Sequence, residues 1–119
     1  MLPNGALVVS GGRPALNLWV NRDGTALGDW EAYDLPTEHN RLVEDPSLRF
    51  CEQFENATAA LGWEQSSAYT RLAALDNDTG LVCYNRQGAA SGGTDPPPAG
   101  CDGDGSQLFC MRFTVQGGA

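Results

Sequence analysis

The stretch that decides the fold is SSAYTRLAALDNDTGLVCY, residues 66–84. Apolar and β-favouring residues lie on both sides of a polar segment, residues 76–80, which is typical of two antiparallel strands joined by a turn. Tyr69 stands near the start of the first strand among small neighbours, so its hydroxyl is free to face a cleft. The stretch therefore predicts a β-hairpin with an accessible phenol near its beginning.

Further strands are predicted on both sides of this hairpin. Residues 6–10, 15–20, 30–35 and 108–115 are short β-rich runs. In the second run, Leu16, Leu18 and Val20 alternate with other side chains, and a period of two indicates a strand with two distinct faces. Residues 1–36 and 66–115 thus supply about three strands each, and the expected class is all-β with antiparallel sheets.

The segments between these strands are predicted to be turns, loops and one insertion. Asp23-Gly24 is expected to turn, because Asp can bond its own backbone two residues on and Gly tolerates positive φ. Residues 37–65 interrupt the strand pattern and are expected to be a helical or irregular insertion. It would contain a short helix over residues 44–54, with Asp45 as N-cap and Pro46 at its first position. Residues 87–106, rich in Gly and Pro, are expected to form a long exposed loop.

Composition limits the partners of the chain. Its 119 residues suggest one domain, and a formal net charge of -8 argues against nucleic acid or an anionic membrane as the main partner. No apolar run approaches the roughly 18 residues that a membrane span needs. Lysine is absent, so all seven positive side chains are arginines. Any anion that the protein binds must be held by locally focused arginines.

The cysteines and sequons indicate the expected compartment. The four cysteines form no Cys-x-x-Cys pair, so no metal site and no cofactor are expected; three disulfide pairings are open, with Cys110 able to reach Cys83 or Cys101. Sequons at Asn56 and Asn77 fit a secreted protein. We expect an extracellular or secretory-pathway setting. Because the N-terminus does not resemble a signal peptide, the chain is expected to begin part-way through a longer protein.

Several motifs together resemble a known family. They are Leu2-Pro3-Asn4-Gly5, Gly12-Arg13-Pro14, Asn21-x-Asp23-Gly24 ending at Trp30, Ser67-Ala68-Tyr69-Thr70, and Gly80-Leu81-Val82-Cys83-Tyr84. Together they look like the C-terminal part of a sialidase (neuraminidase), a six-bladed β-propeller with Asp-box (BNR) repeats. The Asp-box match is degenerate, because Asn21 replaces the usual Ser, Gly24 follows Asp23 directly, and Trp30 comes late.

This resemblance implies a fold and an activity. Residues 1–36 and 66–115 would be about two blades of an incomplete propeller. Arg13 would be the third arginine of the family's triad, which holds the sialic acid carboxylate of a sialylated glycan. Tyr69 would be the catalytic nucleophile, and a tyrosine suits a reaction centre whose own carboxylate would repel Asp or Glu. The other catalytic residues of the family come from upstream blades, so this segment would be an inactive fragment by itself.

Plainer interpretations stand beside this one. Tyr69 could be an ordinary tyrosine half-buried on a sheet, and Arg13 could be a loop arginine beside Pro14. His39 is the only histidine, so no Ser-His-Asp site can be built around any other histidine. His39 itself is expected in a loop without a chemical role. The alternative function is a non-catalytic β-propeller or small sheet module that binds glycans or proteins.

Overall fold

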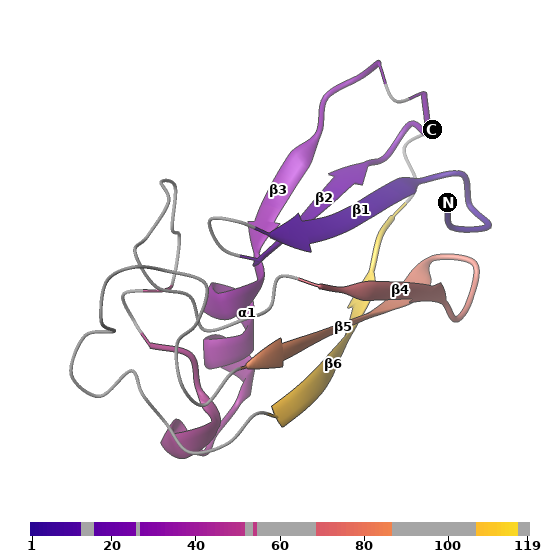
Figure 1. Cartoon of the computed structure of the whole chain (residues 1–119). Coiled ribbons are helices and arrows are strands. Elements are labelled where there is room, and N and C mark those ends of the chain that lie inside the picture. Colours follow the sequence, from indigo (N-terminus) through magenta and orange to yellow (C-terminus); the bar gives the residue numbers. More distant parts are fainter. Residues whose placement is uncertain (13–15, 26, 52–53, 55–68, 87–106, 117–119) are drawn as a thin grey trace.

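The computed structural model describes residues 1–12, 16–25, 27–51, 54, 69–86 and 107–116, which are mostly β-structure (Figure 1). The first antiparallel sheet has the order β1-β2-β3, with β1 at Leu7–Gly12, β2 at Leu16–Asn21 and β3 at Glu31–Asp34. The second has the order β4-β5-β6, with β4 at Arg71–Ala74, β5 at Thr79–Arg86 and β6 at Gln107–Thr114. The predicted antiparallel β class is confirmed for this part of the chain.

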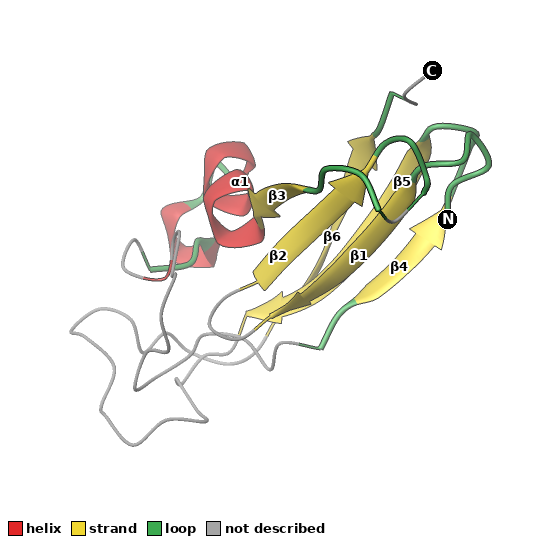
Figure 2. Cartoon of the chain, turned by 90° about the horizontal axis from the view of Figure 1, so that it is seen from above, coloured by secondary structure: helices red, strands yellow, loops and turns green. Residues whose placement is uncertain are grey.

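The two sheets pack against each other over one apolar core, with a helix at one end (Figure 2). Along β2 and along β5 every second residue is buried, because side chains of a strand alternate between its two faces. The buried apolar residues of both strands belong to the same cluster: Leu16, Leu18, Val20, Val82 and Tyr84. The alternation that predicted the strand at 15–20 therefore marks the residues whose side chains pack in the core.

The hairpin predicted from residues 66–84 is present, with a shorter first strand. Strands β4 and β5 are antiparallel, and Arg71 lies opposite Cys83 while Ala74 lies opposite Gly80. The turn is closed by backbone bonds from the amides of Leu75 and Asp76 to the carbonyl of Thr79, 2.8 and 3.1 Å long. The first strand begins at Arg71, and residues 66–68 lie outside the described part of the chain.

The N-terminal segment joins the two sheets at the end where this turn lies. The Asn4 side-chain amide donates to the carbonyl of Val115 at 2.9 Å, and the Asn4 backbone amide donates to the carbonyl of Asn77 at 3.0 Å. The amide of Val115 donates in turn to the carbonyl of Asp78 at 2.7 Å. One asparagine therefore connects the N-terminus with the β4–β5 turn and with the residue that follows β6.

The turn predicted at Asp23-Gly24 is confirmed, with the expected cause. The Asp23 carboxylate accepts from the backbone amide of Thr25 at 3.0 Å and from its hydroxyl at 2.9 Å. These two bonds hold the Asp23 pKa below its usual range. Gly24 has φ of +71°, and a Cβ there would lie 2.1 Å from the carbonyl oxygen of Gly5, so only glycine fits.

The helix prediction was wrong in place and length. Helix α1 spans Leu35–Leu42, and the described residues of the predicted helix position contain the short 3-10 turn Pro46–Leu48 and no α-helix. Asp45 does cap that short turn, its carboxylate accepting from the amide of Ser47. Asp34 caps α1 by accepting from the amide of Thr37, with Pro36 in the first turn, where a missing amide hydrogen costs nothing.

A disulfide joins the two long strands of the second sheet. Cys83 and Cys110 lie directly opposite each other on β5 and β6 and are bonded. This is one of the two pairings considered for Cys110. Cys51 is also disulfide-bonded.

Candidate functional site

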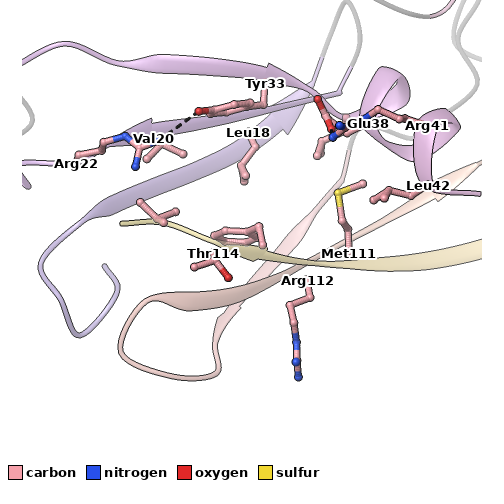
Figure 3. A pocket seen from close by; sticks show the side chains of 13 residues that line it. Leu18, Val20, Arg22, Tyr33, Glu38, Arg41, Leu42, Met111, Arg112 and Thr114 are labelled. Atoms are coloured by element: carbon pink, nitrogen blue, oxygen red, sulfur yellow. Dashed lines mark hydrogen bonds and ion pairs between the residues drawn. The ribbon is translucent and has the colours of Figure 1, made fainter. Parts of the chain in front are cut away.

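A cleft of about 250 Å³ opens between the two sheets, where strand β3 and helix α1 face strand β6 (Figure 3). Its apolar lining comes from both sheets, from both ends of α1 and from the residue after β6: Leu18, Val20, Leu35, Leu42, Met111, Phe113 and Val115. In Figure 3 Leu18 projects from the first sheet and Met111 from β6, so the two side chains face each other. The floor can therefore receive an apolar group and exclude water around it.

Three polar side chains form a connected group at one end of the cleft. Arg22, which follows β2, donates to both carboxylate oxygens of Glu31 on β3, at 2.7 and 3.1 Å. The Tyr33 hydroxyl donates to the same carboxylate at 2.5 Å. Arg22 also donates to the carbonyl of Gln116 at 3.0 Å, which ties the group to the chain beyond β6. We call Arg22, Glu31 and Tyr33 the polar rim.

The strand register explains why these residues meet. Glu31 lies opposite Val20 and Tyr33 lies opposite Leu18, so both side chains share the inner face of the sheet with the buried leucine and valine. Strand β3 is at the edge of its sheet, where that face is open to solvent. Charged side chains can therefore point inward at this edge and still be hydrated.

The electrostatics of the polar rim suit binding better than proton transfer. The two bonds from Arg22 and the one from Tyr33 lower the Glu31 pKa to about 2. The Tyr33 pKa is raised, mainly because its hydroxyl donates to Glu31. A general base works best with a pKa near the operating pH, and a phenol must lose its proton to become a nucleophile. Both shifts move these groups away from catalysis at neutral pH.

The opposite end of the cleft is formed by α1. Glu38 and Arg41 line the cleft and form an ion pair on successive turns of this helix. Arg112 on β6 borders the cleft, but its side chain points away from it (Figure 3). Both guanidinium groups that lie at the cleft mouth are thus already paired with a carboxylate.

The helix that forms this wall is anchored by His39, which the sequence analysis wrongly placed in a loop. His39 lies in α1 and is 1% exposed, among the rings of Phe50, Tyr84 and Phe109 at centroid distances of 4.9, 5.7 and 4.5 Å. Its Nε2 lies 2.9 Å from the carbonyl of Leu48, and its Nδ1 lies 2.8 Å from the Tyr84 hydroxyl. A carbonyl only accepts, so Nε2 carries the proton and Nδ1 accepts from Tyr84.

Burial keeps this pair neutral. Desolvation is the largest effect on the His39 pKa and lowers it. The hydrogen bond to the Leu48 carbonyl raises this pKa, the positive charge of Arg86 lowers it, and the net result is a lowered pKa. Desolvation raises the Tyr84 pKa to about 12. Arg86, 3% exposed, donates to the carbonyl of Ser47 at 3.3 Å and to the Gln107 side chain. Helix α1 is therefore held to the second sheet by the neutral His39–Tyr84 hydrogen bond, and the buried Arg86 joins the 3-10 turn that follows the helix to the same sheet.

The two residues predicted from the sequence lie elsewhere. Tyr69 precedes β4 and is 81% exposed, outside the cleft. Arg13 lies outside the described residues. Ser10, three positions before Arg13, and Thr70, next to Tyr69, are hydrogen-bonded through their hydroxyls at 2.6 Å. Sequence reasoning did not single out the polar rim; a charged and an aromatic residue two apart on the predicted strand at 30–35 were the available signal.

Two negative findings apply to the described part of the chain. No helix there is long and apolar enough to cross a membrane. Within the same residues, no three His, Cys, Asp or Glu side chains are grouped so as to hold a metal ion.

Comparisons with protein-family models, with curated proteins and with solved structures found no match to this chain. The functional assignment therefore rests on the residues of the cleft and of the sheet surfaces.

Proposed function

We propose that this chain is a non-catalytic β-sheet module that binds a sugar unit of a glycan in the cleft between its two sheets. The observation that carries the proposal is the combination of an apolar floor with a polar rim whose charges are already paired. Sugar rings have apolar faces and hydroxyl edges, so one ring can use both parts of the cleft. Small-molecule sites commonly combine apolar walls with a few placed polar groups.

The polar rim retains capacity for a ligand. The Arg22 guanidinium has five N–H donors, and four are used in the bonds to Glu31, Tyr33 and Gln116. Oxygen Oε1 of Glu31 accepts one bond, from Arg22, and can accept another. A hydroxyl group both donates and accepts, and so fits the spare donor and the spare acceptor at the cleft mouth.

The test is a titration of the purified chain with a panel of monosaccharides, including free sialic acid, followed by NMR chemical-shift changes. We expect the shifts to map to Met111, Phe113 and Tyr33. Glu31→Gln should weaken binding about tenfold, in line with the loss of a charge-assisted hydrogen bond. Glu31 is bonded to the lining residues Arg22 and Tyr33; Glu44→Gln, at an exposed carboxylate that bonds to neither of them, is the matched control. Equal affinity of the two variants, or no saccharide bound, would contradict the proposal.

The sialidase-like assignment is a second proposal, and the contact between Ser10 and Thr70 favours it. Those residues are three and one positions from Arg13 and Tyr69, so described residues close in sequence to each predicted site residue are in contact. In this proposal the two sheets are two blades of a six-bladed propeller, completed by upstream blades. Arg13 holds the carboxylate of a terminal sialic acid, and Tyr69 attacks its anomeric carbon.

The disulfide and the sequon at Asn77, on an exposed turn, fit the extracellular setting expected for such a protein. The test is hydrolysis of a fluorogenic sialoside by the longest reading frame that contains this chain. Tyr69→Phe should abolish turnover and leave the substrate affinity in place. Unchanged turnover in Tyr69→Phe, or a reading frame without further propeller repeats, would reject this second proposal.

A further inference from the structure

The arginines of the described chain fall into two groups. Four have partners: Arg22 pairs with Glu31, Arg41 with Glu38, Arg49 donates to the carbonyls of Val43 and Glu44, and Arg86 is buried with Ser47 and Gln107. Arg71 and Arg112 are exposed and have no hydrogen-bonding or ionic partner among the described residues. These two are the guanidinium groups left free for a ligand.

Both free arginines lie on the same surface, the outer face of the second sheet. Arg71 lies opposite Cys83, and Arg112 lies opposite Leu81. Val82, between those two residues on β5, is buried in the core, so its neighbours on the strand point outward. With β5 between them and an offset of two residues, the Cα atoms of Arg71 and Arg112 are about 12 Å apart by strand geometry.

Tyr69 belongs to this surface as well. The hydroxyl of Thr70 is bonded to Ser10, and Ser10 lies opposite the buried Leu18, so Thr70 points to the inner side. Side chains of an extended segment alternate, which places Tyr69 and Arg71 on the outer side. The 81% exposure of Tyr69 agrees with that placement.

Among the strand residues that the structure describes on the outer face, two are arginines and none is acidic. These strand residues, in register across the sheet, are Arg71, Ala73, Thr79, Leu81, Cys83, Asn85, Leu108, Cys110, Arg112 and Thr114. The whole chain has a formal net charge of -8, so this face differs in sign from the molecule around it. Because the Debye length is about 8 Å at physiological ionic strength, a ligand in contact senses mainly the local charges.

We propose that the outer face of β4-β5-β6 binds an anionic polysaccharide, with Arg71 and Arg112 as anion contacts and the Tyr69 ring as a stacking platform. The guanidinium fork pairs with carboxylate or sulfate groups through parallel hydrogen bonds. The hydroxyl side chains of Thr79 and Thr114 stand on the same face and can bond to sugar hydroxyls. The cleft lies on the inner side of the sheets, so this surface is separate from the one proposed for a sugar unit above.

A polysaccharide fits the surface better than an acidic protein segment does. The outer face is built by a three-stranded sheet, with the exposed Tyr69 and Arg71 near one end of the strands and the hydroxyls of Thr79 and Thr114 at the other. An aromatic ring with free arginines beside it provides both the stacking and the anion contacts that a chain of acidic sugars needs.

The experiment measures binding of the purified chain to heparin, hyaluronan, polyglutamate and neutral dextran by isothermal titration calorimetry over a range of NaCl concentrations. The double variant Arg71→Ala/Arg112→Ala should lose about tenfold or more in affinity for the anionic polymers. Arg49→Ala removes one charge and is the matched control for each single variant, Arg71→Ala and Arg112→Ala, because Arg49 is exposed but lies off this sheet. Tyr69→Ala should weaken binding, whereas Tyr69→Phe keeps the ring and should bind as wild type.

Each outcome decides the proposal. Salt-sensitive binding to heparin or hyaluronan but not to dextran, lost in the double variant and kept in Arg49→Ala, supports it; the better polymer identifies sulfate or carboxylate as the anion. Equal losses in the single variants and in Arg49→Ala would show a general charge effect and overturn it. Tight binding of polyglutamate that does not depend on Tyr69 would favour an acidic protein partner and overturn the sugar assignment. Glu31→Gln should leave binding to the outer face unchanged. A failure of the polysaccharide proposal can therefore be distinguished from a failure of the sugar site proposed in the cleft.

Discussion

The two sheets have the same order of antiparallel neighbours but are held together by different chemistry. In the first sheet, the edge strand β3 is fixed to the end of β2 by the exposed bonds among Arg22, Glu31 and Tyr33. In the second, β5 and β6 are joined by the Cys83–Cys110 disulfide. The second sheet is also bonded to α1 through the buried pair of His39 and Tyr84.

The difference separates groups that stabilise the fold from groups that are available to a ligand. Exposed ion pairs contribute little to stability, because water hydrates the separated charges almost as well. A buried hydrogen bond is different, since removing one partner leaves the other without water or protein to bond. The polar rim can therefore be altered without unfolding the chain, whereas the buried pair cannot.

The largest effect is expected from removing the disulfide. Cys83→Ala/Cys110→Ala deletes a link between residues 27 apart in sequence, and should lower the free energy of unfolding by about 3–4 kcal/mol. Urea denaturation followed by circular dichroism measures the change. If this double variant were as stable as Glu31→Gln, the assignment of the second sheet's stability to its covalent link would be wrong.

Next in size is a matched pair of hydroxyl deletions. Tyr84→Phe leaves Nδ1 of His39 buried without a donor and should cost about 1–3 kcal/mol in the free energy of unfolding. Tyr33→Phe makes the same chemical change at a half-solvated site, where water can replace the lost donor. Comparable losses in the two variants would remove the distinction between the two networks.

Acid should act first on the buried pair. The folded-state pKa of His39 lies below its ordinary value of 6.5, so the unfolded chain binds the proton more readily. Stability should therefore fall as the pH drops through 6.5 toward the folded-state pKa, because the unfolded state gains protons there. His39→Gln should flatten the pH dependence of the urea midpoint between pH 7 and 5, since the sequence holds no other histidine. A slope that persists in His39→Gln would contradict this assignment.

The smallest effect on stability is expected at the polar rim. Glu31→Gln should leave the urea midpoint at pH 7 unchanged within error, because the pair with Arg22 is exposed. The Glu31 pKa should nevertheless be measurable near 2 by NMR titration of its carboxyl carbon, and Arg22→Ala should move it back toward 4.5. A carboxyl that already titrates near 4.5 in the wild type would show that the rim is not formed in solution.

Local chemistry made part of the structure predictable. The alternation of Leu16, Leu18 and Val20 predicted a strand because each such residue must reach the same core. The turn at Asp23-Gly24 was predictable because its hydrogen bonds join residues two apart. The cap at Asp45 was correct for the same reason, although the helix after it is a single turn.

Neighbouring residues and composition specify the strands, their turns and the small number of positive side chains in an acidic chain. The packing of the fold specifies that Glu31 and Tyr33 meet Arg22, that Cys110 pairs with Cys83, and that His39 is buried against Tyr84. The partners in those contacts are up to 45 positions apart. Which distant side chains meet depends on strand register and on how the sheets pack, and no local pattern specifies either.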